Sequence, residues 1–194
     1  MFIYLDTETT GSDPEARLCQ IAYKTDEGTM ADELFNPGMK ISIGSMSIHH
    51  ITNKMVADKP PFRGSPIFKN LQMMFTRDDL VLVGHNAKFD VVMLNNEGLY
   101  PQKVVCTNKL ARYLDRDGIL FEYGLQFLRY YMKLDIEATP HTAMGDVLVM
   151  EKVFQKLYAK IKKHFVGMDP ISVMIEISRS PARMSFLPLS KTTV

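Results

Sequence analysis

The chain has 194 residues, of which 46% are hydrophobic, so it is long enough for one domain with a sizeable core and short for two. Its 23 Lys and Arg residues against 22 Asp and Glu residues give a formal net charge of +1, which excludes the large basic excess by which many proteins grip nucleic acid. No run of eighteen apolar residues occurs and no leader precedes the first strand, so we expect a soluble, cytoplasmic protein.

The first 35 residues contain three strand-like runs. We expect strands near residues 2–6, 17–24 and 29–35, arranged as an antiparallel sheet. The sequence Asp26-Glu27-Gly28 predicts the hairpin turn between the last two strands.

The rest of the chain alternates strands with helices. Short helices follow from Ser45, and the next elements are strands near 80–83 and 103–106 with helices near 66–75, 87–96, 109–114, 122–132 and 142–163. This order predicts an α/β fold with a mixed central sheet flanked by helices. Residues 1–168 would form one domain, and 169–194 a short helix, beginning at Pro170, and an irregular tail.

The two cysteines, Cys19 and Cys106, lie in apolar, strand-like contexts. Their spacing is not that of a metal site, so we expect buried free thiols.

The first strand ends in two acids, Asp6 and Glu8, followed by Thr9-Thr10-Gly11. Side chains alternate along a strand, so both carboxylates should leave the same face of the sheet. Two carboxylates so close together repel each other unless a cation lies between them. Their hard oxygen ligands suit Mg²⁺ or Mn²⁺. The alternative is an ordinary turn with both acids facing solvent.

Two later segments add acids at the starts of helices. Asp90 follows the sequence Gly84-His85-Asn86 and should lie at the border of the core-facing side of its helix. Asp146 falls among the apolar positions of the long helix, with His141 in the loop before it. An unpaired carboxylate on a buried face is costly, so a metal partner is expected. The alternatives are a capped helix and a core histidine with satisfied nitrogens.

Together these segments resemble a known family. An Asp-x-Glu-x-Thr-Gly strand, a His-Asn-x-x-Phe-Asp helix start and a His-x-Ala-x-x-Asp helix start, in that order, are similar to the three motifs of the DEDDh 3′–5′ exonucleases. Residues 45–59 and 106–112 most resemble the bacterial exonuclease X group. The resemblance covers residues 1–165 and implies a ribonuclease H-like fold.

The resemblance also implies a mechanism for hydrolysing a phosphodiester with two divalent ions, Mg²⁺ or Mn²⁺. Asp6 would bridge both ions, Glu8 and Asp146 would complete the site of the attacking water, and Asp90 would act on the second ion. His141 would be the general base.

Substrate contacts carry over at four matching positions, which are Thr9, Ile48, His49 and Phe89. In the family these surround the 3′-terminal nucleotide, although Ile48 and Phe89 could instead belong to the core. The sequence departs from its relatives at Gly145, where a larger residue is usual, and at His50, where many have Gly. Gly145 costs helix stability, about 1 kcal/mol relative to Ala, and would admit a close neighbour.

The resemblance therefore implies a 3′–5′ exonuclease that releases nucleoside 5′-monophosphates from nucleic acid with a free 3′ end, DNA being favoured. An RNase T-like or oligoribonuclease-like exoribonuclease is the second interpretation. A non-catalytic nucleic-acid-binding module is the third, although such a module has no need of five catalytic-type groups.

Overall fold

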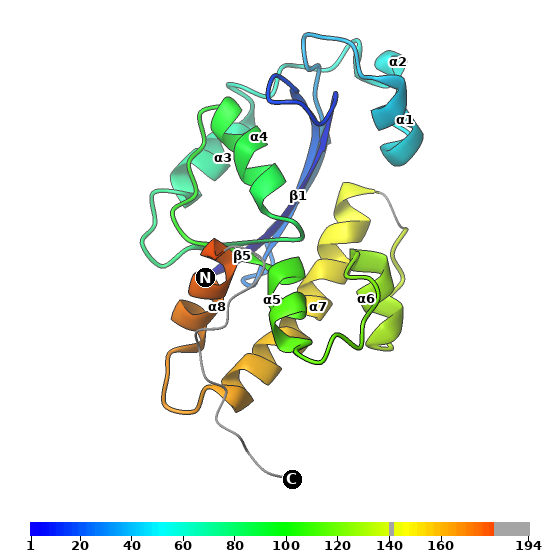
Figure 1. Ribbon diagram of the computed structural model, residues 1–194. Helices are drawn as coiled ribbons and strands as arrows, with labels where there is room; N and C mark the ends of the chain where they lie inside the picture. Colours follow the sequence, from blue (N-terminus) through cyan, green and yellow to red (C-terminus); the bar gives the residue numbers. More distant parts are fainter. Residues whose placement is uncertain (140–141, 181–194) are drawn as a thin grey trace.

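The chain folds around a five-stranded mixed sheet in the order β3-β2-β1-β4-β5, and the computed structural model describes residues 1–139 and 142–180 (Figure 1). Strand β1 pairs antiparallel with β2 and parallel with β4, while β3 pairs with β2 and β5 with β4. The mixed sheet is therefore confirmed. The strand bounds are β1 Phe2–Thr9, β2 Leu18–Thr25, β3 Met30–Leu34, β4 Val81–Gly84 and β5 Val104–Cys106.

The helices cover both faces of this sheet (Figure 1). Helices α3 and α4 lie over one face, and α5, α6 and α7 lie over the other. The helix bounds are α1 Ile43–His49, α2 Asn53–Val56, α3 Pro66–Met74, α4 Lys88–Asn96, α5 Thr107–Leu114, α6 Leu125–Tyr131, α7 Ala143–His164 and α8 Pro170–Arg179.

Two helix starts differ from the sequence-based expectation. Helix α6 begins at Leu125 rather than near residue 122, because Gly124 is still extended at the N-cap. Helix α5 begins at Thr107 rather than near residue 109, because β5 passes into it directly after Cys106. The last helix begins at Pro170 as expected, with the Asp169 carboxylate accepting hydrogen bonds from the backbone of its first turn.

Strand β1 separates two hydrophobic cores. Ile3 and Leu5 point into the core that includes α3, whereas Phe2 and Tyr4 pack against Phe154 of α7 with ring centroids 4.9 and 5.6 Å apart. Because side chains alternate along the strand, Asp6 and Glu8 lie on the same face as Phe2 and Tyr4, toward the beginning of α7.

A buried ion cluster holds the far end of α4. Glu97, only 2% exposed, accepts from Arg17 Nε at 2.7 Å and from Arg63 Nε at 3.0 Å. Two arginines on one buried carboxylate offset its desolvation, so α4 is fixed against the start of β2.

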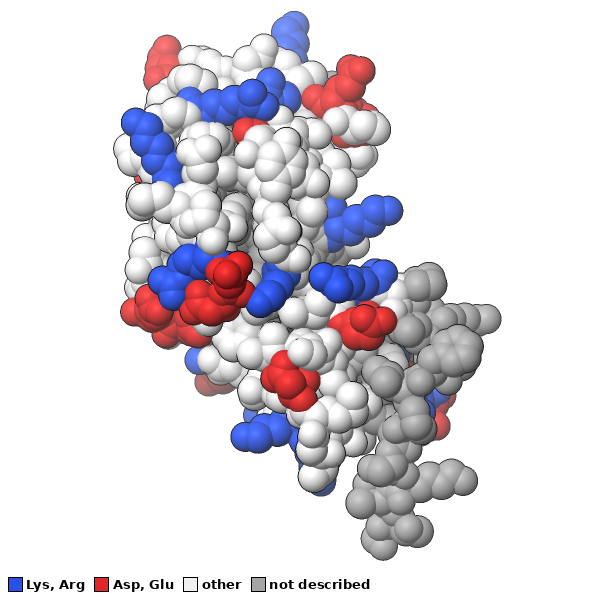
Figure 2. Space-filling model, turned by 90° about the vertical axis from the view of Figure 1, so that its left-hand side faces the viewer, with Lys and Arg blue, Asp and Glu red and all other residues white. Residues whose placement is uncertain are grey.

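Both cysteines are buried free thiols, as expected. Charged side chains of both signs are interspersed over the face drawn in Figure 2, in keeping with the net charge of +1. Within residues 1–139 and 142–180, no helix is long and apolar enough to cross a membrane. The expected tail after residue 180 lies outside the described residues.

Candidate active site

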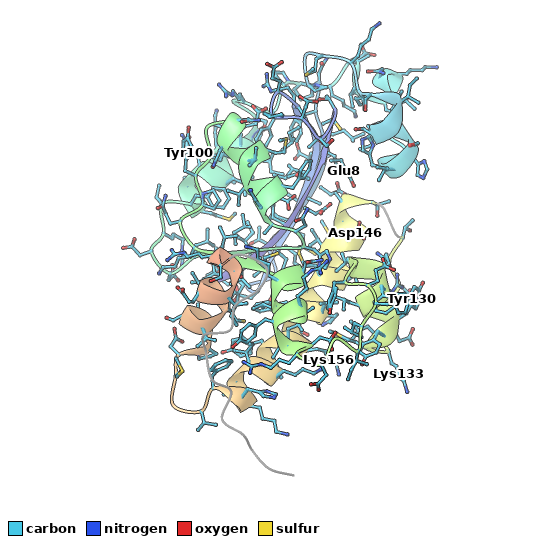
Figure 3. The ribbon with its side chains drawn as sticks, viewed as in Figure 1. Glu8, Tyr100, Tyr130, Lys133, Asp146 and Lys156 are labelled. Carbon is cyan, nitrogen blue, oxygen red and sulfur yellow. The ribbon has the colours of Figure 1, made fainter. Side chains whose placement is uncertain are left out.

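Acids from three separate elements are brought together at the end of β1. Asp6 and Glu8 leave the α7 face of the strand, beyond the aromatic pair that packs on α7. Figure 3 shows Glu8 on β1 and Asp146 in the first turn of α7, near one another. Both acids of β1 interact electrostatically with Asp146 and Asp90, so the four acids lie in one region of the fold, and their role as a shared metal site stays a prediction.

Asp90 reaches this cluster from α4 through contacts with β1. Its side chain is 3% exposed, and its Oδ1 accepts hydrogen bonds from the backbone N–H of Thr7 at 3.1 Å and from Thr7 Oγ1 at 2.8 Å. Thr7 therefore positions an acid that lies 83 residues away in the sequence. The sequence offers one signal for this role, since Thr7 stands between the two acids of the first motif.

The pKa values of these carboxyls reflect burial and mutual repulsion. Burial raises the pKa of Asp6 well above its usual range, and the charges of Asp90, Glu8 and Asp146 raise it further. Burial, then the charges of Asp146 and Asp90, raises the pKa of Glu8 to about 8. For Asp90, burial raises the pKa to about 7 against the opposing effect of the Thr7 hydrogen bonds.

These carboxylates are neighbours that repel one another. Among the residues that the structure describes, no three His, Cys, Asp or Glu side chains are gathered closely enough to hold a metal ion. Their donor chemistry nevertheless fits a hard divalent cation, which takes oxygen ligands and favours the ionised form of each carboxyl.

A hydrogen-bonded chain from α6 orients Asp146. Gln126 Nε2 donates to Asp146 Oδ1 at 2.7 Å, and Arg129 Nη1 donates to Gln126 Oε1 at 3.3 Å. Arg129 is 8% exposed and also donates to the carbonyls of Ile136 and Ala138, in the segment that leads toward α7. Sequence reasoning missed this pair, because Gln126 and Arg129 occupy an amphipathic stretch with no motif to mark them.

Two of the described histidines, His49 and His85, have both ring nitrogens engaged in hydrogen bonds. His49 is 7% exposed, its Nδ1 accepts from the N–H of Ile51 at 3.0 Å, and its Nε2 is 3.2 Å from Thr9 O. An accepting Nδ1 places the proton on Nε2, which donates to that carbonyl. His85 Nε2 donates to Tyr123 O at 3.0 Å, and burial lowers the pKa of His85 to about 4.

The remaining expected residues fall in different environments. Ile48 is 61% exposed and Phe89 is partly buried, so neither is a fully enclosed core residue. The Thr9 hydroxyl is buried and donates to Gly11 O at 2.6 Å. His141 lies outside the described residues, and its role as general base stays a prediction.

Gly145 stands where no side chain fits. A Cβ there would overlap the carbonyl oxygen of Thr139 and come within 2.6 Å of Thr142 Oγ1. Thr142 is the N-cap of α7, and its Oγ1 accepts from the N–H of Gly145 at 3.2 Å. The close neighbour anticipated from the sequence is therefore the backbone that enters α7.

Comparisons with known proteins show the family of this chain. The family model described as "Exonuclease" matches residues 3–154. A DNA polymerase III subunit epsilon from Treponema pallidum is 32% identical over 169 residues, covering 81% of this chain and 76% of that protein. A DNA polymerase III subunit epsilon-like protein from Rhodobacter capsulatus is 30% identical over 177 residues, covering 83% of this chain but only 24% of that protein.

A solved structure of exonuclease X in complex with 5′ overhanging duplex DNA has a similar fold. The TM-score is 0.70 at 28% sequence identity, and the match covers 92% of this chain and 99% of the other.

Replacing Gly145 with Ala should destabilise the protein by about 1–3 kcal/mol, because the new methyl group overlaps fixed backbone and overpacking has that cost. Thermal unfolding of the purified variant measures the loss. Gly44→Ala in α1 is the matched control, since its Cβ would meet only Ser42 Oγ at 3.9 Å. Equal stability of the two variants would contradict the close approach.

The raised carboxyl pKa values predict that the metal-free protein loses stability as pH rises. The folded protein retains the Glu8 proton up to pH 8, whereas the unfolded chain releases it near pH 4.5, so the folded form binds more protons between these values. Glu8→Gln should reduce the fall in the free energy of unfolding between pH 5 and 8 by more than about 1 kcal/mol. A shift of one pKa unit already corresponds to about 1.4 kcal/mol. The measurement is the free energy of unfolding against pH, from denaturant unfolding in chelator, with Glu15→Gln as the control. If the pH dependence of Glu8→Gln equals that of the wild type, Glu8 is not the source of the pH dependence.

Proposed function

Because this chain belongs to the exonuclease family, we propose that it is a metal-dependent 3′–5′ exonuclease that hydrolyses DNA to nucleoside 5′-monophosphates. The observation that carries the proposal is the convergence of Asp6, Glu8, Asp90 and Asp146 from three elements at the end of β1. The similarity to exonuclease X, solved with 5′ overhanging duplex DNA, favours DNA as the substrate.

The four carboxylates would hold two divalent ions, Mg²⁺ or Mn²⁺. Such ions lower the pKa of an attacking water and stabilise charge on the leaving 3′ oxygen. Burial raises the pKa values of Asp6, Glu8 and Asp90, and repulsion raises those of Asp6 and Glu8 further, which makes the metal-free site costly to ionise. A cation would relieve that cost, which supports a metal at these residues.

His141 would accept the proton of the attacking water. Both ring nitrogens of His49 and His85 are occupied by contacts within the described protein, which leaves neither ring available for proton transfer without rearrangement. The sequence places His141 directly before the N-cap of the helix that carries Asp146. Both facts support its assignment as base.

The 3′ end would lie beside β1 and α1. The exposed Ile48 would contact the terminal base, and Phe89 would line the same pocket. His49 connects α1 to β1 by hydrogen bonding to Thr9 O, so it would hold this part of the pocket in place while the Thr9 backbone meets the nucleotide.

Replacing Asp6 with Asn should lower turnover at least about a thousandfold, because the carboxylate expected to bridge the two ions is lost. The assay uses 5′-labelled single-stranded DNA, 5′-overhang duplex DNA and RNA of one sequence with Mg²⁺. Ladders shortened from the 3′ end, fastest on DNA, are expected, and a 3′-phosphate should slow cleavage.

The matched control for this assay is Asp58→Asn, at an exposed turn after α2, which should retain full activity. Activity in excess chelator, or cleavage of a circular strand, would refute the metal-dependent exonuclease. Faster degradation of RNA would select the exoribonuclease alternative.

Replacing His141 with Ala should lower the rate about 10²- to 10⁴-fold, the usual contribution of a positioned base. The base must be neutral to accept a proton, so the wild-type rate should rise with pH through the histidine pKa. Rate against pH at saturating Mg²⁺ is the measurement. An acidic limb that persists unchanged in the variant would place the base elsewhere.

A further inference from the structure

A cavity opens beside the start of α4, apart from the acidic cluster. It has a volume of about 290 Å³ and lies between the first residues of α4, strand β5 and the end of α8. Val91, Val104 and Cys106 contribute apolar or weakly polar surface to it, and Asn86 and Gln102 add two amide side chains.

The charged side chains that line this cavity are all cations, namely Lys88, Lys109 and Arg179. No acidic residue lines it, so a local charge of +3 stands on a chain whose formal net charge is only +1. Concentrated positive charge with low-dielectric walls attracts and holds an anion.

The three cations differ in what they already bind. Lys109 donates to the carbonyls of Ser178 at 2.6 Å and Ser180 at 2.9 Å, so it fixes the end of α8 as one wall of the cavity. Lys88 and Arg179 are exposed, and within the described residues neither forms an ion pair. Their charges are therefore available to a ligand.

Backbone also contributes to the site. Helices α4 and α5 both begin at the cavity, and in neither does a side chain cap the first turn. The N–H groups and the positive dipole end of such a turn favour an anion and add to the field of the three cations.

The cavity and the acidic cluster share the first turn of α4. Lys88 lines the cavity, whereas Asp90, two residues later, accepts hydrogen bonds from Thr7 of β1. One helical turn spans about 5.4 Å, so a bound strand can reach from one side of this turn to the other.

We propose that this cavity binds a phosphate group of the substrate strand other than the phosphate that is hydrolysed. The inference rests on the proposed exonuclease function and identifies where the strand is held beyond its 3′ end. Charge, size and position all match a backbone phosphate with its sugar against the apolar surface.

The test compares two double variants of equal charge. Lys88→Gln with Arg179→Gln removes both exposed cations of the cavity, and Lys69→Gln with Lys162→Gln removes two exposed lysines from α3 and α7. Lys109 is kept because it holds α8 in place. Thermal unfolding verifies that both variants fold.

Two measurements follow on each protein. Anisotropy of a labelled single-stranded dodecamer in chelator gives affinity against salt, and kcat/KM with Mg²⁺ is compared between the dodecamer and a dinucleotide. The dinucleotide is a dinucleoside monophosphate without a terminal phosphate, so its single phosphate is the one that is hydrolysed. In the cavity variant we expect at least a tenfold loss of affinity for the dodecamer. The slope of log affinity against log salt concentration should be shallower by about 0.7, for one lost phosphate contact. The ratio of kcat/KM for the dodecamer to kcat/KM for the dinucleotide should fall at least tenfold.

A loss no greater than that of the control would overturn the proposal. The proposal would also be overturned if inorganic phosphate binds at the cavity but the affinity for the dodecamer is unchanged in the cavity variant. The ligand of the cavity would then be a free anion and not the strand. If the wild type hydrolyses neither substrate but its affinity for the dodecamer depends on Lys88 and Arg179, the exonuclease function fails and the phosphate site stands.

Discussion

Desolvation of the carboxylates at the end of β1, together with the repulsion among them, is the constraint on which the site depends. Burial raises the pKa values of Asp6, Glu8 and Asp90, so these acids are neutral more readily than ordinary acids, and the charge of Asp146 adds to this effect for Asp6 and Glu8. Such an arrangement costs folding free energy unless a cation compensates it. The two hydrophobic cores on either side of β1 must therefore hold in place a cluster that by itself would move apart.

Strand β1 performs this task by dividing its side chains between two faces. Its aromatic residues pack on α7, which carries Asp146, and its aliphatic residues pack toward α3 and α4. Thr7 joins the two sides, since its hydroxyl and N–H both bind the carboxylate of Asp90. Rigid secondary structure on both faces thus orients acids that come from distant parts of the chain.

Close approach of backbone is the second constraint, and it explains an unusual residue. Gly145 allows the segment ending in Thr139 to pass directly over the first turn of α7, and Arg129 holds the same segment by its carbonyls. Through Gln126, Arg129 also reaches the carboxylate of Asp146. The orientation of the Asp146 carboxylate therefore depends on α6 as well as on α7.

The order of the elements and the mixed sheet could be predicted from the amino-acid sequence, because alternation in strands and periodicity in helices are local properties of the chain. A close neighbour at Gly145 and two buried free thiols were also predicted from the sequence. Only the tertiary structure decided the roles of Thr7 and Gln126 and the cationic cavity beside α4. Hydrogen bonds and cavities between elements far apart in the chain leave no period in the sequence, so they exist only once the sheet brings those elements together.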